Sequence, residues 1–276
     1  MTWLAVCACI GICACICVGI FVCVCVCVRG RGRVRPSIEL VHDRRVVAGQ
    51  PGFDAYFAGM TPCDLAARGA PTREAVREAY LAAVMPRSPA SAAYAAKMEA
   101  AEAHGALHGP RRTAARMRVV VLDDRTSKAG VEGGWPHTHG ELICMPASYL
   151  DGADLAQLAR TLAHERMHVC QRMEPGRCTT PRPAGRVSVA DFDARFPDLA
   201  ARRRSNPDLD GYLYGEDGWV VVSLFDSETA ATAGGMGAAK VTRVDLSTGQ
   251  TVVAPRGTYE HPNEAQAYAS EDKYKN

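Results

Sequence analysis

The chain has 276 residues, of which 47% are hydrophobic and 22% are charged, and its formal net charge is +2. This length and composition suit one or two globular domains, and the small net charge does not indicate an acidic or a basic partner. Eight of the twelve cysteines lie within the first 27 residues, and the other four form no CxxC pair, so a zinc finger has no support.

The first 36 residues differ from the rest of the chain. Residues 3–28 carry no charge, and as a helix they would be roughly 39 Å long, more than the hydrocarbon core of about 30 Å. We predict that residues 1–36 are a cysteine-rich, single-pass transmembrane anchor with a basic flank, and that residues 37–276 form the folded domain. Arginines follow the apolar run at once, and the positive-inside rule then predicts a cytoplasmic domain.

Other interpretations of this region stay open. The alternation VCVCVCV in residues 22–28 has the period of a strand, and such a segment can aggregate if it meets no membrane. The run is also of low complexity, so the true start of the protein can lie downstream. The basic run RGRGRVR suits RNA or anionic lipid, but beside an apolar helix we interpret it as a membrane flank and expect no nucleic-acid partner.

The first half of the body is predicted to contain loops, two helices and two strands. Residues 36–72 are rich in Gly and Pro and predict loops and short turns. Residues 72–85 and 91–107 have helical patterns, and Thr72 can cap the first of them. Residues 116–122 and 140–145 predict strands. His137 and His139, in WPHTHG, are interpreted as part of a turn, with a contribution to a cleft as the alternative.

Residues 154–173 predict a long helix that contains the pattern H-E-x-x-H, with His164, Glu165 and His168. Residues four apart on a helix lie about 40° apart and one turn apart in height, so both imidazoles can reach one metal ion. Glu165 lies on the adjacent strip, where it can reach a water molecule held by that metal. The apolar residues Leu155, Leu158, Leu162, Val169 and Met173 form a second stripe that should face the core.

The motif HERMH, on a helix that follows a strand, resembles the zincin superfamily of zinc metallopeptidases. The longer form AHERMHVCQ is similar to the H-E-x-x-H-V-x-Q version of several members. The resemblance covers the motif helix only. It implies an α+β, zincin-like fold with a small mixed sheet and an active-site helix, Zn2+ as the cofactor, and a peptide or protein as the substrate.

Strands are predicted between the motif helix and the C-terminus. Residues 211–214, 219–225, 240–246 and 250–254 have strand patterns, and residues 247–249 suit a hairpin turn. Residues 185–210 predict a short helix and a basic turn. We interpret the segment at about 211–255 as a β-rich insert in the metallopeptidase domain.

A catalytic zinc needs a third protein ligand. The residues after His168, VCQRMEPGRC, do not contain the metzincin pattern of a Gly followed by a third His. Residues 261–270, HPNEAQAYAS, predict a C-terminal helix, and NEAQA resembles the segment that carries the third ligand in gluzincins. This resemblance implies Glu264 as the ligand, 264 − 168 = 96 residues after His168, with His261 as the next candidate. The alternative is that Glu264 only interacts with the helix dipole.

These features predict a membrane-anchored zinc peptidase in which Glu165 takes the proton of the attacking water. The strand at 140–145 would then be the sheet edge on which an extended substrate pairs. Tyr259, Tyr268, His261 and His139 are candidates for stabilising the oxyanion. The alternative is a catalytically inactive, zincin-like interaction protein. The four body cysteines allow three pairings into two disulfides in an oxidising compartment, whereas free thiols would support the cytoplasmic orientation.

Overall fold

The computed structural model describes residues 38–108, 116–126, 131–174, 178, 183 and 185–272. All of them belong to the compact unit Ser37–Asn276, and the other unit is Met1–Pro36. The predicted transmembrane segment at residues 3–28 and its arginine flank lie outside the described residues. Among the described residues, no helix is both long enough and apolar enough to cross a membrane.

The fold is a mixture of helices and small sheets, as predicted. The largest sheet has the order β1-β2-β4-β3. Strands β1, β2 and β4 are parallel, and β3 is antiparallel to β4. The strands have the bounds β1 (Ile38–Leu40), β2 (Met117–Leu122), β3 (His137–His139) and β4 (Leu142–Pro146). Strands β2 and β4 are apolar and buried along almost their whole length. This pattern is typical of strands in a sheet that is covered on both faces.

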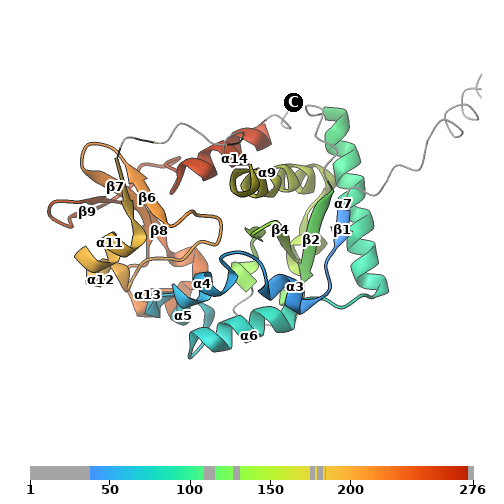
Figure 1. The fold of residues 1–276 in the computed structure, drawn as a ribbon, viewed down its shortest axis with the longest axis horizontal. Helices are drawn as coiled ribbons and strands as arrows, with labels where there is room; N and C mark the ends of the chain where they lie inside the picture. The colour runs from blue at the N-terminus through green and yellow to red at the C-terminus, as the bar shows by residue number, and fades with distance from the viewer. Residues whose placement is uncertain are drawn as a thin grey trace, which may run out of the picture. The chain divides into compact units, whose positions relative to one another are not determined.

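Helices pack on both faces of this sheet, and Figure 1 shows α9 and α6 on opposite sides of β2 and β4. Alternate residues of β2 divide between the two cores, with Val119 and Val121 on one side and Val120 and Leu122 on the other. The first core includes α7 (Pro89–His108), α8 (Ala147–Gly152) and α9 (Leu155–Met173). The second includes α3 (Arg44–Ala48), α4 (Phe53–Ala58) and α6 (Arg73–Ala83).

The second half of the domain has its own small core, formed by residues such as Phe192, Val220 and Val244. Its strands form a pair and a three-stranded sheet: β5 (Gly185–Ser188) with β6 (Tyr212–Gly215), and β7 (Trp219–Leu224), β8 (Lys240–Asp245) and β9 (Thr251–Val253). Its short helices are α11 (Val189–Arg195), α12 (Pro197–Ala200) and α13 (Glu228–Gly234). The predicted strands of this region are therefore confirmed, and β5 was not predicted.

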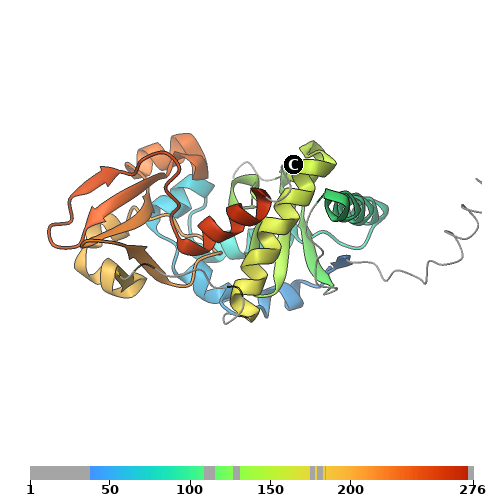
Figure 2. The same cartoon turned by 90° about the horizontal axis from the view of Figure 1, so that it is seen from above.

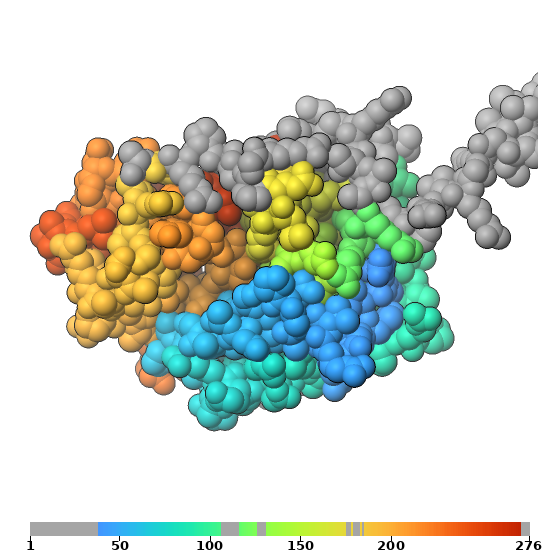
Figure 3. Space-filling view, viewed as in Figure 1, coloured from blue at the N-terminus to red at the C-terminus, as the bar shows by residue number. Residues whose placement is uncertain are grey.

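The two halves of the domain are linked by α5 and α14. Helix α5 (Pro62–Arg68) packs on α13 and on the 3-10 turn Gly235–Ala238. In Figure 3 the segments from α3 to α6, blue to cyan, extend along one side of both halves. Helix α14 (Pro262–Asp272) follows β9 and packs beside α9, as Figure 2 shows. Two further 3-10 turns, Asp124–Thr126 and Val131–Gly134, lie between β2 and β3.

The prediction of loops for residues 36–72 was wrong, because β1 and the three helices α3, α4 and α5 lie there. These helices have only five to seven residues each, and glycines end all three. Such frequent glycines are typical of loops in a sequence pattern. The helices form because their apolar side chains are buried, with Phe53 and Phe57 in the second core.

The strand predicted at 140–145 is confirmed as β4, but the prediction that it forms the edge of the sheet was wrong. Strand β4 is not an edge strand, because β2 pairs with one of its sides and β3 with the other. The short helix α8 separates β4 from α9. His137 and His139 lie in the edge strand β3 rather than in a turn, and both are buried.

The predicted helices at 72–85, 91–107 and 154–173 are confirmed within a few residues at each end. The predicted core stripe of α9 is only partly right. Leu158 and Leu162 are fully buried, but Leu155 and Met173, at the two ends of the helix, are exposed. The buried part of the stripe is therefore confined to the middle turns of the helix.

Candidate metal centre

Helix α9 carries the H-E-x-x-H residues on its buried middle turns. Asp154 caps the helix, since its carboxylate accepts a hydrogen bond of 2.7 Å from the backbone N–H of Gln157. His164, Glu165 and His168 are all buried. They are held between α14 on one side and the sheet on the other, so their positions depend on tertiary packing as well as on the helix.

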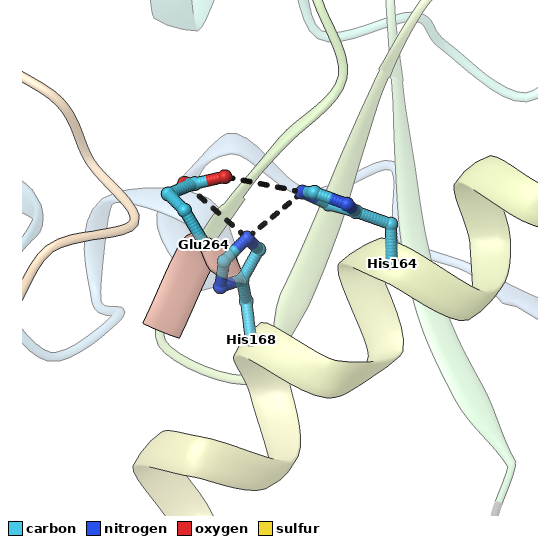
Figure 4. A group of neighbouring side chains, drawn as sticks. All are labelled: His164, His168 and Glu264. Carbon is cyan, nitrogen blue, oxygen red and sulfur yellow. Dashed lines mark hydrogen bonds and ion pairs between the residues drawn. The ribbon is translucent and has the colours of Figure 1, made fainter. Parts of the chain in front are cut away.

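The structure brings His164, His168 and Glu264 together (Figure 4). The Nε2 atoms of the two histidines are 3.0 Å apart, and each lies 3.5 Å from a carboxylate oxygen of Glu264. One ligand atom from each residue lies within 4.8 Å of the other two. The two histidines come from α9 and the glutamate comes from the first turn of α14. His261, the other predicted candidate, instead contacts Asp210 at 3.0 Å.

A second layer of side chains holds the two imidazoles. Nδ1 of His164 lies 2.8 Å from Oε1 of Glu271, at a distance that fits an ion pair, although the ring N–H does not point directly at the carboxylate. Nδ1 of His168 is 3.0 Å from Oε1 of Gln171. Gln171 is itself fixed by donating to the backbone oxygen of Asn263 and to the side chain of Gln266. Both imidazoles are therefore oriented with Nε2 toward Glu264.

The donor set fits a divalent metal ion. Two imidazoles and one carboxylate are a common ligand set of catalytic zinc, with one position left open. At bond lengths of about 2.0–2.1 Å, two tetrahedral nitrogen ligands lie roughly 3.3 Å apart, close to the 3.0 Å between the two Nε2 atoms. Two ring nitrogens at this distance repel each other unless a proton or a cation lies between them. Outer partners such as Glu271 and Gln171 are also typical of metal-binding histidines.

The electrostatics of His164 follow from its acidic neighbours. Burial lowers its pKa, but Glu264 and Glu271 outweigh burial and raise the pKa to about 10. Burial opposes ionisation of Glu264 as well, yet the two histidines hold the pKa of that carboxyl below its usual value. In the absence of a metal, the cluster therefore binds a proton at neutral pH.

Glu165 lies beside this cluster without belonging to it. Its side chain is buried, and its Oε2 atom has no hydrogen-bond partner among the described residues. Burial and then the carboxylate of Asp208 raise the pKa of Glu165 well above its usual range, whereas the charge of His164 lowers it. A cation held by the neighbouring histidines would act in the same direction as that charge. Glu165 is thus a carboxyl group with a free acceptor and a proton affinity suited to acid–base chemistry.

His164, Glu165 and Glu264 form part of the wall of a cavity of about 530 Å³. Tyr259 and Tyr268 also line it, and the ring of Tyr268 contacts the ring of His164 with 4.7 Å between their centres. Of the four predicted oxyanion stabilisers, only these two tyrosines border the cavity. His261 and His139 are buried elsewhere. The remaining cavity residues include Glu132, Trp135, Tyr149, Arg204, Asp208, Glu260 and Glu271.

The edge of the sheet beside the cavity is already occupied. The backbone N–H of Thr138, in β3, donates to Oδ1 of Asp208 at 2.9 Å. Arg172, from α9, donates to the carbonyl oxygens of Gly140 and Pro207 at 3.2 Å and forms an ion pair of 3.1 Å with Asp208. Burial raises the pKa of Asp208, but the charges of His168 and Arg172 outweigh burial and hold this pKa at about 2. Asp208 is therefore ionised at neutral pH, and its carboxylate occupies the outward-pointing N–H of Thr138 in β3.

One disulfide bond lies at the end of α9, between Cys170 and Cys178. Cys63 and Cys144 are free and buried. Of the pairings that the sequence allows, the structure thus contains one bond and two thiols. Cys170 directly precedes Gln171, so the disulfide fixes the chain beside the residue that orients His168.

Comparisons of the chain with protein-family models, with curated proteins and with solved structures gave no match.

The sequence did not identify Glu271, Asp208, Arg172 or Arg204 as residues of the site. Glu271 had a detectable signal, because it lies seven residues after Glu264 and so on the same strip of a helix. Gln171 stands in the same relation to His164. The other three belong to loops or to a different face of α9, and the sequence has no periodicity that would place them.

Proposed function

We propose that the chain is a membrane-anchored, zinc-dependent peptidase of the zincin type, with zinc held by His164, His168 and Glu264. The observation that carries this proposal is the convergence of these three side chains beside a cavity that His164, Glu264 and Glu165 border. A structural zinc site would need neither the cavity nor a carboxyl group with an unused oxygen. Glu165 thus favours catalysis over a non-catalytic, zincin-like interaction protein.

When bound, zinc would polarise the substrate carbonyl and lower the pKa of the attacking water. Glu165 would accept the proton of that water through Oε2, which has no other partner among the described residues. The same group would then return the proton to the leaving amine. Tyr268 and Tyr259 border the cavity beside His164, and their hydroxyls are the candidates for stabilising negative charge on the carbonyl oxygen.

Glu165→Gln tests the catalytic part of this proposal. The amide keeps the size of the side chain but cannot accept the proton. We expect peptide hydrolysis to fall by about 10²- to 10⁴-fold while the zinc content stays at one per chain. Glu228→Gln, a change at an exposed residue of α13, is the matched control and should leave both quantities unchanged. Full activity of Glu165→Gln would rule out the mechanism.

Glu264→Ala tests the metal site. The purified full-length protein should contain one zinc per chain, and the variant should lose most of it, because two histidines alone bind zinc weakly. Elemental analysis of both proteins after dialysis measures this, with Glu228→Ala as the control. Undiminished zinc in Glu264→Ala would remove this residue from the site.

The membrane anchor and its orientation form a separate part of the proposal. Residues 3–28 would hold the protein in a membrane, and removal of residues 1–36 should release it from the membrane fraction at high pH. The arginine flank favours a cytoplasmic domain. The disulfide Cys170–Cys178 favours an oxidising compartment instead. Thiol labelling of Cys170 and Cys178 in intact cells decides between the two orientations, because only a cytoplasmic domain should keep both thiols reduced.

A further inference from the structure

The cavity beside the proposed zinc ligands is lined by one positively charged side chain whose charge is not balanced. Arg204 is the only Lys or Arg among the described residues that border it. No ion pair and no side-chain hydrogen bond joins its guanidinium to any described residue, and its Nε is buried without an acceptor. A buried donor without a partner is costly. The position of Arg204 therefore indicates an anionic ligand.

The ring of Trp135 orients this guanidinium. The Cζ atom of Arg204 lies 4.9 Å from the centre of the indole ring. Such stacking uses the face of the guanidinium and leaves the N–H groups along its edge available. A planar carboxylate is the group that two of these N–H donors can bind together. Trp135 borders the same cavity and is itself half exposed, so this arrangement lies within reach of a ligand.

Most acidic groups of the cavity already have partners of their own. Glu132 forms an ion pair of 2.9 Å with Arg68, and Asp208 forms one of 3.1 Å with Arg172. Glu264 and Glu271 belong to the histidine cluster. Glu260 accepts a hydrogen bond of 3.2 Å from the backbone N–H of Ser223 and lies outside ion-pairing distance of Arg204. These groups therefore do not neutralise Arg204.

The sheet edge next to the cavity offers few free backbone groups for pairing with a long substrate. Along β3 and the residues next to it, every second residue directs its backbone groups away from β4. These residues are Pro136, Thr138 and Gly140. Pro136 has no N–H, both backbone groups of Thr138 are used by Asp208 and Arg172, and the oxygen of Gly140 is used by Arg172. Other groups of the cavity are therefore better placed to hold a substrate.

We propose that the cavity binds peptides through a carboxylate, with Arg204 as the recognition residue and the free C-terminus of the substrate as the source of the carboxylate. This inference rests on the proposed peptidase function. One water would add across a peptide bond near the C-terminus as its C–N bond breaks. The products are a shortened peptide with a new carboxylate and a C-terminal fragment with a free amine. The chain is thereby assigned to the carboxypeptidases rather than to the endopeptidases.

Matched peptides test this assignment with the zinc-loaded, full-length protein. Three peptides of one sequence are compared: a free acid, a C-terminal amide, and an amide with one glutamate side chain near its end. We expect kcat/KM for the free acid to exceed that for the plain amide by about 10- to 100-fold, the effect of one charge-assisted contact. Equal rates on the free acid and the plain amide would overturn the proposal. A higher kcat/KM for the glutamate-containing amide than for the free acid would show that the recognised carboxylate belongs to a side chain. That result would overturn the C-terminus as the source of the carboxylate.

Arg204→Gln should lower kcat/KM for the free acid much more than for the amide, so that the preference for the acid is lost. Arg204→Lys should restore part of the preference. Arg202→Gln is the control, because the guanidinium of Arg202 donates to the backbone oxygens of Phe225 and Asp226 and lies outside the cavity. An equal loss on acid and amide in Arg204→Gln would show a structural role and overturn the proposal.

A binding measurement separates this inference from the proposed function. Zinc-loaded Glu165→Gln is titrated calorimetrically with an acetylated dipeptide as free acid or as amide, with and without Arg204→Gln. Binding of the free acid that depends on Arg204 supports the carboxylate site even if the native protein cleaves no peptide, a result that would overturn only the peptidase function. Cleavage of amides at internal bonds together with Arg204-independent binding would keep the peptidase and overturn the carboxylate site.

Discussion

The domain contains two pairs of neighbouring histidines that are equally buried but lie in opposite electrostatic surroundings. His164 and His168, on α9, face the carboxylates of Glu264 and Glu271. His137 and His139, on β3, lie among the rings of Phe53, Tyr56, Phe57 and Tyr80. The pKa of His164 is raised to about 10 by its acidic neighbours, whereas burial lowers the pKa of His139 to about 3.

The difference shows that burial alone does not make a histidine a metal ligand. In both pairs the rings are removed from water, and in both the two rings contact each other edge to face. Only the pair on α9 has carboxylates that can share a cation with it. In the pair on β3, burial keeps His139 neutral, and the ring of His137 contacts the hydroxyl of Tyr80 and the carbonyl of Trp135. This pair stabilises the sheet edge, and the pair on α9 forms the proposed site.

The largest expected effect separates the two pairs directly. His168→Ala should remove the bound zinc and lower peptide hydrolysis by at least about 10³-fold, because it deletes a ligand. His139→Phe should keep one zinc per chain, since a phenyl ring suits the aromatic cluster and the Nε2 that it replaces has no partner. Zinc content and hydrolysis are measured on the same preparations. Equal losses of zinc and hydrolysis in both variants would mean that the pair on β3 is needed for the metal site as much as the pair on α9.

The second prediction concerns stability in acid. His139 has an ordinary pKa near 6.5 when unfolded and about 3 when folded. Below about pH 6.5 the unfolded state therefore binds a proton that the folded state excludes. Stability should fall as the pH drops from about 6.5 to about 3, by up to about 5 kcal/mol in total. Urea unfolding at several pH values measures this.

His139→Phe serves as the control for this pH dependence, because it removes the titrating group. Between pH 3 and pH 6.5, the free energy of unfolding of the variant should depend less steeply on pH. The difference in slope should be about 1.4 kcal/mol per pH unit, the contribution of one proton. Identical slopes in the two proteins would show that His139 is not excluded from protonation in the folded state.

The third prediction uses the raised pKa of His164. Because this group is charged below about pH 10 in the metal-free protein, zinc has to displace its proton. Zinc affinity should increase about tenfold per pH unit as the pH rises toward 10, and at neutral pH about one proton should be released per zinc. Calorimetry in two buffers of different ionisation enthalpy counts the protons. Glu271→Gln, which removes one source of the raised pKa, should reduce the pH dependence above pH 8.

The smallest effect is expected for Gln171→Ala. This side chain orients His168 through a contact of 3.0 Å but is not itself a ligand. Zinc affinity should fall about tenfold, the lower end of what outer-shell residues contribute. Competition with a chromogenic chelator measures it, with the exposed Gln250→Ala as the control. An unchanged affinity would mean that α9 alone orients His168.

Much of the local structure followed from sequence patterns. The spacing of His164 and His168, the cap at Asp154 and the end of the helix at Met173 are properties of one segment, and a helix determines how residues four apart are placed. The strands downstream of α9 have β-branched residues and turn signals, and they were predicted nearly to the residue. The helices of residues 36–72 were missed, because they form only where Phe53 and Phe57 are buried.

The sequence by itself determined the motif helix, the strands around it and the spacing of His164 and His168, since helical and strand periodicity depend on neighbouring residues, and it named Glu264 only through a resemblance. Tertiary structure alone placed Glu264 beside His164 and His168, 96 residues from the nearer one (264 − 168), because α14 packs along α9. It also decided that β3 rather than β4 is the sheet edge and that Asp208 and Arg172 cover it. The physical reason is that burial, charge pairing and the cavity with its unpaired Arg204 arise only when distant segments pack together.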